Sequence, residues 1–123
     1  MWACKNGKMI DQNDIQKHLS LALHEASPEK MVQDVMPAVF SAEVPEKPIM
    51  LLAFGKAASR MFDGFAETIG LERVKEALII SHTLENKISD CGKIQYKYAP
   101  HPLPDYNSLE AGTVAKRFVK NIS

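Results

Sequence analysis

The segment from residue 49 to residue 82 constrains the fold most, because it places a helical pattern between two apolar runs. The run IMLLAF (49–54) is apolar without alternation, which is typical of a strand covered on both faces of a parallel α/β sheet. After Gly55, apolar residues recur at helical spacing up to Gly70, a residue suited to end a helix. The run EALIISH (76–82) predicts a second buried strand. The segment therefore predicts a strand–helix–strand unit with a right-handed crossover.

Two further helical patterns precede this unit. The stretch 11–26 has apolar residues at helical spacing behind Asp and Asn residues able to cap a helix. Ser27, Pro28 and Glu29 then form a typical helix start. Because proline lacks the N–H that a helix interior needs, we expect Pro37 to interrupt this second helix.

The C-terminal part predicts one more strand and a closing helix. GKIQYKYAP (92–100) alternates apolar and polar residues, as in a strand exposed on one face and placed at an edge. SLEAGTVAKRFVKN (108–121) predicts a helix, with Asn107 and Glu110 as a start that resembles a capping box. The apolar residues expected to face inward are Ala111, Val114, Ala115, Phe118 and Val119.

These patterns together predict an α/β fold. We expect a Rossmann-like three-layer sandwich with a mainly parallel, incomplete sheet, preceded by two N-terminal helices. The 123 residues suit a single domain, with a helical segment at 1–43 and a β-α-β-β-α core at 48–123.

Composition and charge restrict the class of protein. Hydrophobic residues make up 46% and charged residues 24%, the balance of a soluble globular protein. Lys and Arg (15) equal Asp and Glu (15), so net charge indicates neither nucleic acid nor a membrane surface as partner.

The apolar runs are far shorter than the roughly 20 residues of a membrane span. The N-terminal stretch lacks a secretory signal, which favours the cytoplasm, and Cys4 and Cys91 are expected to be free thiols.

Candidate site residues follow the predicted strands, where open α/β sheets bind their ligands. Three segments would meet there: Gly55–Lys56, 81–83 and the loop 101–108. Lys56 stands at the start of a helix, where a cation is disfavoured by a few tenths of a kcal/mol to about 1 kcal/mol. Either an anion such as phosphate or carboxylate binds there, or the side chain bends into water.

The common nucleotide-binding and metal-binding motifs do not occur. A P-loop needs Ser or Thr after its lysine, whereas Ala57 follows Lys56. The dinucleotide fingerprint GxGxxG fails because Ala53 and Ala58 stand where glycines belong. No ligand spacing for a metal is recognisable. SHT (81–83) could be a polar turn, and PHPLPD (100–105) a stiff connection whose prolines hold its polar residues in place.

Two stretches carry a resemblance to a known family. LLAFGKAASRMFDGF (51–65), followed by a strand and by PHPLPDYNSLEAG (100–112), resembles the N-terminal domain of glycerate 2-kinases, often labelled hydroxypyruvate reductases or MOFRL proteins. SPEKMV (27–32) is similar to the family's D-P-E-x-x-V. The resemblance covers nearly the whole chain. It implies an enzyme that uses ATP and Mg²⁺ to phosphorylate the 2-hydroxyl of D-glycerate, in a cleft between two α/β domains.

The resemblance also implies roles for single residues. Lys56 would be the catalytic lysine, within a phosphate-binding turn formed by Gly55, Lys56 and Ala57. Phosphoryl transfer needs positive charge where the γ-phosphoryl oxygens pass, and a lysine at a helix N-terminus supplies it. The residues that would line or shape the substrate side are His101, Asp105 and Ser108.

Two departures from the family pattern limit these implications. Pro100 stands where the family has glycine in G-H-P-x-P-D, so the entry into this loop is expected to differ. The chain also ends before the family's Ser-Gly-rich loop and second catalytic domain. Because half a site cannot position both ATP and acceptor, we expect no kinase activity from this chain alone.

Three expectations concern partners and alternative functions. The final helix is expected to expose an apolar surface that favours self-association or docking of a missing domain. A binding module that holds a small anion with Lys56 is one alternative to the kinase. A non-catalytic subunit that docks through its sheet edge is the other.

Overall fold

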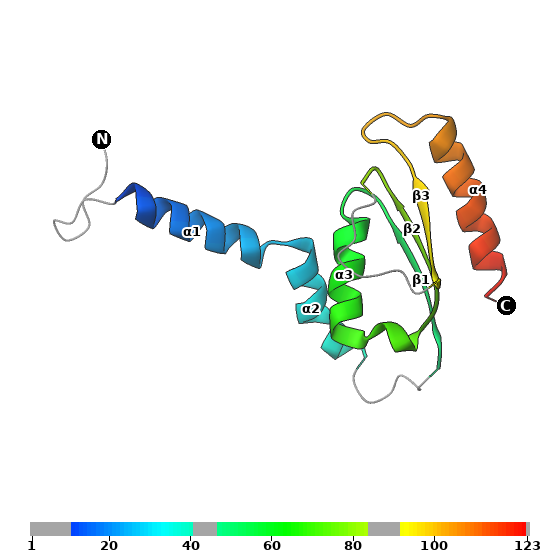
Figure 1. Cartoon of the computed structure of the whole chain (residues 1–123), viewed down its shortest axis with the longest axis horizontal. Coiled ribbons are helices and arrows are strands. Elements are labelled where there is room, and N and C mark those ends of the chain that lie inside the picture. Colours follow the sequence, from blue (N-terminus) through cyan, green and yellow to red (C-terminus); the bar gives the residue numbers. More distant parts are fainter. Residues whose placement is uncertain (1–10, 41–46, 84–91, 123) are drawn as a thin grey trace.

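A computed structural model of the chain describes residues 11–40, 47–83 and 92–122. A parallel sheet of three strands, in the order β1-β2-β3, lies between helices on its two faces (Figure 1). The α/β class and the three layers are as predicted from the sequence. The strands are β1 (Ile49–Phe54), β2 (Val74–Ser81) and β3 (Ile94–Tyr98).

The central strand β2 forms the core because alternate side chains point to opposite faces of a sheet. Ala77 and Ile79 pack with α3 (Ala58–Ile69) and α2 (Pro28–Val39) on one face. Leu78 and Ile80 pack on the other face with α4 (Tyr106–Lys120). All four side chains are buried, which explains why the run had no polar alternation.

The helices α2 and α3 pack closely at Gly64. A Cβ at this position would lie 2.5 Å from the Glu29 carbonyl oxygen, so only glycine allows the two backbones to approach this far. Arg60 Nε donates to Glu29 Oε1 at 2.7 Å across the same interface, and this bond raises the pKa of Arg60 above its ordinary value. Backbone contact and ion pair together hold α2 against α3.

The predicted break at Pro37 is wrong. Helix α2 runs through Pro37 to Val39, and the Phe40 N–H donates to the Met36 carbonyl at 2.9 Å. Pro37 lies in the last turn, so its missing N–H removes one bond of a ladder that ends soon afterwards.

The first helix, α1 (Gln12–Glu25), forms as predicted but packs differently from the others. Asp11 caps it, accepting from the Asn13 N–H at 2.9 Å. This helix lies wholly within the described ranges and has no buried residue. Figure 1 shows it extending away from the sheet. Its apolar residues Ile15, Leu19 and Leu23 are exposed.

The last strand and the last helix differ in part from expectation. On the face of β3 expected to be exposed, Gln95 is exposed, whereas Lys97 is half-buried and its Nζ lies 3.1 Å from Glu110 Oε1 of α4. On α4, Ala111 and Phe118 are buried as predicted, whereas Val119 is half exposed. Leu109 is exposed as well, so α4 does present apolar side chains to solvent. Self-association through them stays a prediction.

Some predictions concern residues that the structure does not describe. Cys4 and Cys91, expected to be free thiols, lie outside the described ranges. Within those ranges, no helix has the length and apolar character needed to cross a membrane.

Candidate functional site

The three strand-end segments lie together at the carboxyl end of the sheet. The Gly55 N–H donates to the Ile80 carbonyl at 3.0 Å, which extends the pairing of β1 with β2. Ser59, buried in the first turn of α3, donates from Oγ to the Thr83 carbonyl at 2.8 Å. The Ala99 N–H donates to the Ser81 carbonyl at 3.0 Å. These bonds join the turn after β1, the segment after β2 and the start of the loop after β3.

The turn between β1 and α3 carries Lys56. Gly55 has φ +108°, a conformation that side chains disfavour, although a Cβ there would meet nothing within 4 Å. Glycine is therefore needed for the backbone conformation and not for space. Among the described residues, no side chain caps α3 at its N-cap residue Ala57. Lys56 is exposed, and the described residues form no ion pair with it.

This arrangement can hold an anion. The first turn of a helix presents N–H groups and partial positive charge, and an ammonium adjacent to them adds a full charge. A phosphate group fits such a site. The phosphate-binding role that the resemblance implies for Gly55, Lys56 and Ala57 stays a prediction.

In the loop between β3 and α4, Asp105 and Ser108 form the start of α4. Asp105 is the N-cap of α4, and its Oδ1 accepts from the N–H groups of Asn107 (2.8 Å) and Ser108 (3.3 Å). In return, the Asp105 N–H donates to Ser108 Oγ at 3.2 Å. The cap predicted at Asn107 with Glu110 is therefore wrong, because the Asp105 carboxylate reaches the same helix start. Both predicted substrate residues hold the loop in place.

His101 lies in this loop and is exposed. Its ring centroid is 5.9 Å from that of His82, which follows β2. His82 was not among the residues singled out for a role, and its ring nitrogen Nδ1 is buried without a hydrogen-bond partner in the described part of the chain. In the sequence, the only signal for His82 is that SHT (81–83) directly follows a predicted buried strand.

The described residues contain no preformed cluster of metal ligands. No group of three His, Cys, Asp or Glu residues lies close enough to hold a metal ion within the ranges that the structure describes. The Asp105 carboxylate accepts three hydrogen bonds within its own helix cap, the third from Asn107 Nδ2 at 2.9 Å. The described residues thus include groups that fit a phosphate of ATP, and they hold no preformed cluster of three ligands for Mg²⁺.

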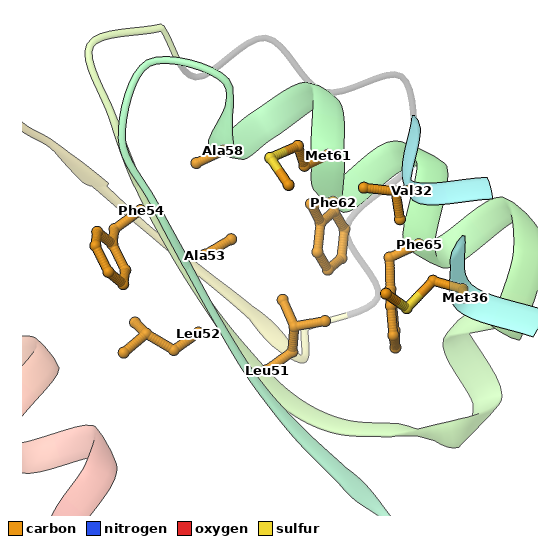
Figure 2. A pocket seen from close by; sticks show the side chains of 10 residues that line it. All are labelled: Val32, Met36, Leu51, Leu52, Ala53, Phe54, Ala58, Met61, Phe62 and Phe65. Atoms are coloured by element: carbon orange, nitrogen blue, oxygen red, sulfur yellow. The ribbon is translucent and has the colours of Figure 1, made fainter. Parts of the chain in front are cut away.

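An apolar pocket of about 330 Å³ lies apart from these residues (Figure 2). It is formed by side chains of β1, α2 and α3, and none of the predicted site residues lines it. In Figure 2, Leu52 and Phe54 lie on one side of the β1 backbone, and Leu51, Met61 and Phe62 lie on the other. Because β1 is an outer strand of the described sheet, the pocket marks a surface beside that strand and not the polar strand-end site.

Comparison with known proteins agrees with this fold. Residues 14–123 match the family model described as "Domain of unknown function (DUF4147)". No curated protein sequence matches the chain. The crystal structure of a glycerate kinase from Thermotoga maritima superposes with a TM-score of 0.67 and 20% sequence identity. The match covers 84% of this chain and 23% of the length of that kinase, so the chain spans less than a quarter of it. The chain belongs to the DUF4147 domain family and has the fold of one segment of a glycerate kinase.

Proposed function

We propose that this chain is the lysine-bearing part of an ATP-dependent glycerate 2-kinase that converts D-glycerate to 2-phosphoglycerate. The observation that carries the proposal is Lys56 at the N-terminus of α3, where no described side chain caps the helix. Family membership and the shared fold with a glycerate kinase support the choice of reaction. The names MOFRL protein and hydroxypyruvate reductase, and a place in the cytoplasm, belong to the same proposal.

In this proposal, Lys56 and the first turn of α3 bind the phosphoryl group of ATP. The transferred group spreads negative charge over its oxygens in the transition state, and fixed positive charge at that point lowers the barrier. The main-chain groups of Gly55 and Ala57 shape the turn around it. ATP supplies the phosphoryl group, and Mg²⁺ is held by groups outside the described residues.

The loop after β3 forms the acceptor side. His101 is exposed at the end of the sheet where Ser81 and Ala99 are joined, so its ring is accessible to a small molecule. Asp105 and Ser108 fix the loop through the cap of α4, and we propose that they act on the acceptor by positioning this loop.

We further propose that phosphoryl transfer needs a second domain. Most of the catalytic effect in this reaction comes from holding both reactants in one geometry. The chain corresponds to 23% of the glycerate kinase that it resembles, and its lysine site is open to solvent. Alone, the chain is therefore expected to bind anions without transferring phosphate.

A coupled assay for ATP-dependent phosphorylation of D-glycerate tests this function. It is run on the chain alone and on a chimera in which the chain replaces the matching segment of the Thermotoga maritima glycerate kinase. We expect turnover only in the chimera, and a loss of about 10²- to 10³-fold with Lys56→Met, as for removal of other charge-stabilising groups. The matched control is Lys116→Met on the exposed surface of α4, which should retain full activity.

Other results would contradict the proposal. Turnover by the chain alone would refute the need for a second domain, and an active Lys56→Met chimera would refute the role of the lysine. A folded chimera without activity would favour the second candidate, a small-anion-binding module built on the same uncapped helix start. The pocket beside β1 is the observation that favours the third, a docking subunit.

A further inference from the structure

We propose that His82 and His101 form a histidine pair that binds the carboxylate of the acceptor molecule. This inference rests on the proposed function and deepens it by naming which group of the acceptor is recognised and by adding His82 to the site. The two side chains come from different segments, after β2 and after β3, and their ring centroids lie 5.9 Å apart with the planes tilted by 52°. Within the described part of the chain, no hydrogen bond joins them.

The surroundings of His82 determine which of its nitrogens can donate. Nδ1 is buried and has no hydrogen-bond partner in the described part of the chain. With or without a proton, that nitrogen is unpaired and closed to a ligand. As part of this proposal, the neutral ring of His82 carries its proton on Nε2. In that tautomer His82 donates to a ligand through Nε2.

A metal ion does not suit this pair. A histidine that binds a metal usually donates from its other ring nitrogen to a carboxylate, a carbonyl or water, and Nδ1 of His82 has no such partner among the described residues. No third ligand accompanies the two rings in the ranges that the structure describes. Asp105, the acidic residue of the same loop, uses both carboxylate oxygens in the cap of α4.

An oxyanion does suit the pair. His82 offers an N–H donor, His101 is an exposed imidazole that can donate as well, and the neighbouring carboxylate of Asp105 is already satisfied. Two N–H donors side by side suit a group that can accept with two oxygens, such as a carboxylate. The acceptor of the proposed reaction carries a carboxylate next to the hydroxyl that receives the phosphoryl group. Binding the carboxylate at the histidine pair leaves Lys56 free for the phosphoryl group.

Nuclear magnetic resonance of the four histidine rings tests the proposal on the chain as it is. The probes are D-glycerate, glycerol, which lacks the carboxylate, and inorganic phosphate. We expect ¹⁵N shifts that show the Nε2–H tautomer for His82. D-Glycerate should shift the ring signals of both His82 and His101, while His18 and His24 on α1 stay unchanged. Glycerol should shift none of them.

Substitutions test whether His82 contributes to affinity. His82→Phe keeps a ring of similar shape but removes the donor, and it should weaken D-glycerate binding about tenfold, as expected for loss of a charge-assisted hydrogen bond. His82→Gln retains an N–H donor near the place of Nε2 and should recover part of the affinity. His24→Gln on the exposed helix α1 is the matched control and should change nothing.

Several results would overturn the proposal. They are equal shifts with glycerol and D-glycerate, a response to phosphate alone, no response to D-glycerate at all, and unchanged affinity in a folded His82→Phe variant. The proposed kinase function fails by a separate readout, because ring shifts need neither ATP nor turnover. If Lys56→Met leaves the D-glycerate shifts intact and the wild-type chimera transfers no phosphate, the histidine pair stands and the kinase does not.

Discussion

The turn after β1 and the loop after β3 both follow parallel strands at the same end of the sheet, and both lead into a helix. They differ in how the helix start is satisfied. At α4, Asp105 and Ser108 form a reciprocal capping box. At α3, no described side chain caps the helix, and Lys56 lies beside its first turn. A capped start uses its N–H groups for the fold, whereas an uncapped start beside a lysine leaves them for a ligand.

The largest expected effect is at the uncapped start. Ala57→Asp places a carboxylate at the N-terminus of α3, where it repels a bound anion and interacts favourably with the helix dipole. We expect phosphate binding to fall by more than tenfold, measured by calorimetry, while the protein gains about 0.3–1 kcal/mol in stability. Ala57→Asn is the control, because it has a similar shape without the charge. Equal binding by both variants would show that no anion binds at this turn.

The capped start should respond in the opposite way. Asp105→Ala removes the acceptor for the N–H groups of Asn107 and Ser108 and should cost about 1–2 kcal/mol of unfolding free energy, measured in urea. Phosphate binding at Lys56 should not change, because the two helix starts are separate. A drop in phosphate affinity without loss of stability would contradict the assignment of Asp105 as a cap.

The smallest effect is expected at Ser108. Ser108→Ala removes one acceptor, for the Asp105 N–H, and leaves the Asp105 carboxylate with its other bonds. The cost should be about 0.5 kcal/mol of unfolding free energy. Ser108→Thr keeps the hydroxyl and serves as the control. If Ser108→Ala destabilised the protein more than Asp105→Ala, the reciprocal cap would not be the main role of these residues.

Local features of the sequence predicted most of the elements. The run 74–80 is apolar at every buried position, and the helix after Gly55 repeats its apolar residues at the helical period, so their structures follow from short-range patterns. The same kind of pattern predicted α1, but it did not show whether another element packs against the apolar face of this helix. Periodicity determines which face of a helix is apolar and leaves open what packs against it.

Features that depend on neighbouring groups were not predictable in the same way. Asp105, Asn107 and Ser108 are all residue types that can cap a helix, and the sequence does not show which of them is the cap. In the structure Asp105 is the cap, because its carboxylate accepts from two N–H groups. His82 follows β2 and His101 follows β3, and these two strands pair side by side. The proximity of the two rings therefore depends on the path of the chain after each strand, which short sequence patterns do not specify. The meeting of the three strand-end segments could be predicted because parallel strands end together, whereas their detailed contacts could not.

The central claim is that the start of α3 binds an oxyanion and the start of α4 does not. The most direct measurement is a titration of the ¹⁵N-labelled chain with inorganic phosphate, following backbone amide signals at both helix starts. Saturable shifts of the amides from Gly55 to Arg60, with those of Asn107 and Ser108 unchanged, are the predicted result. Equal shifts at both starts, or shifts at α3 that persist unchanged in Lys56→Met, would contradict the claim.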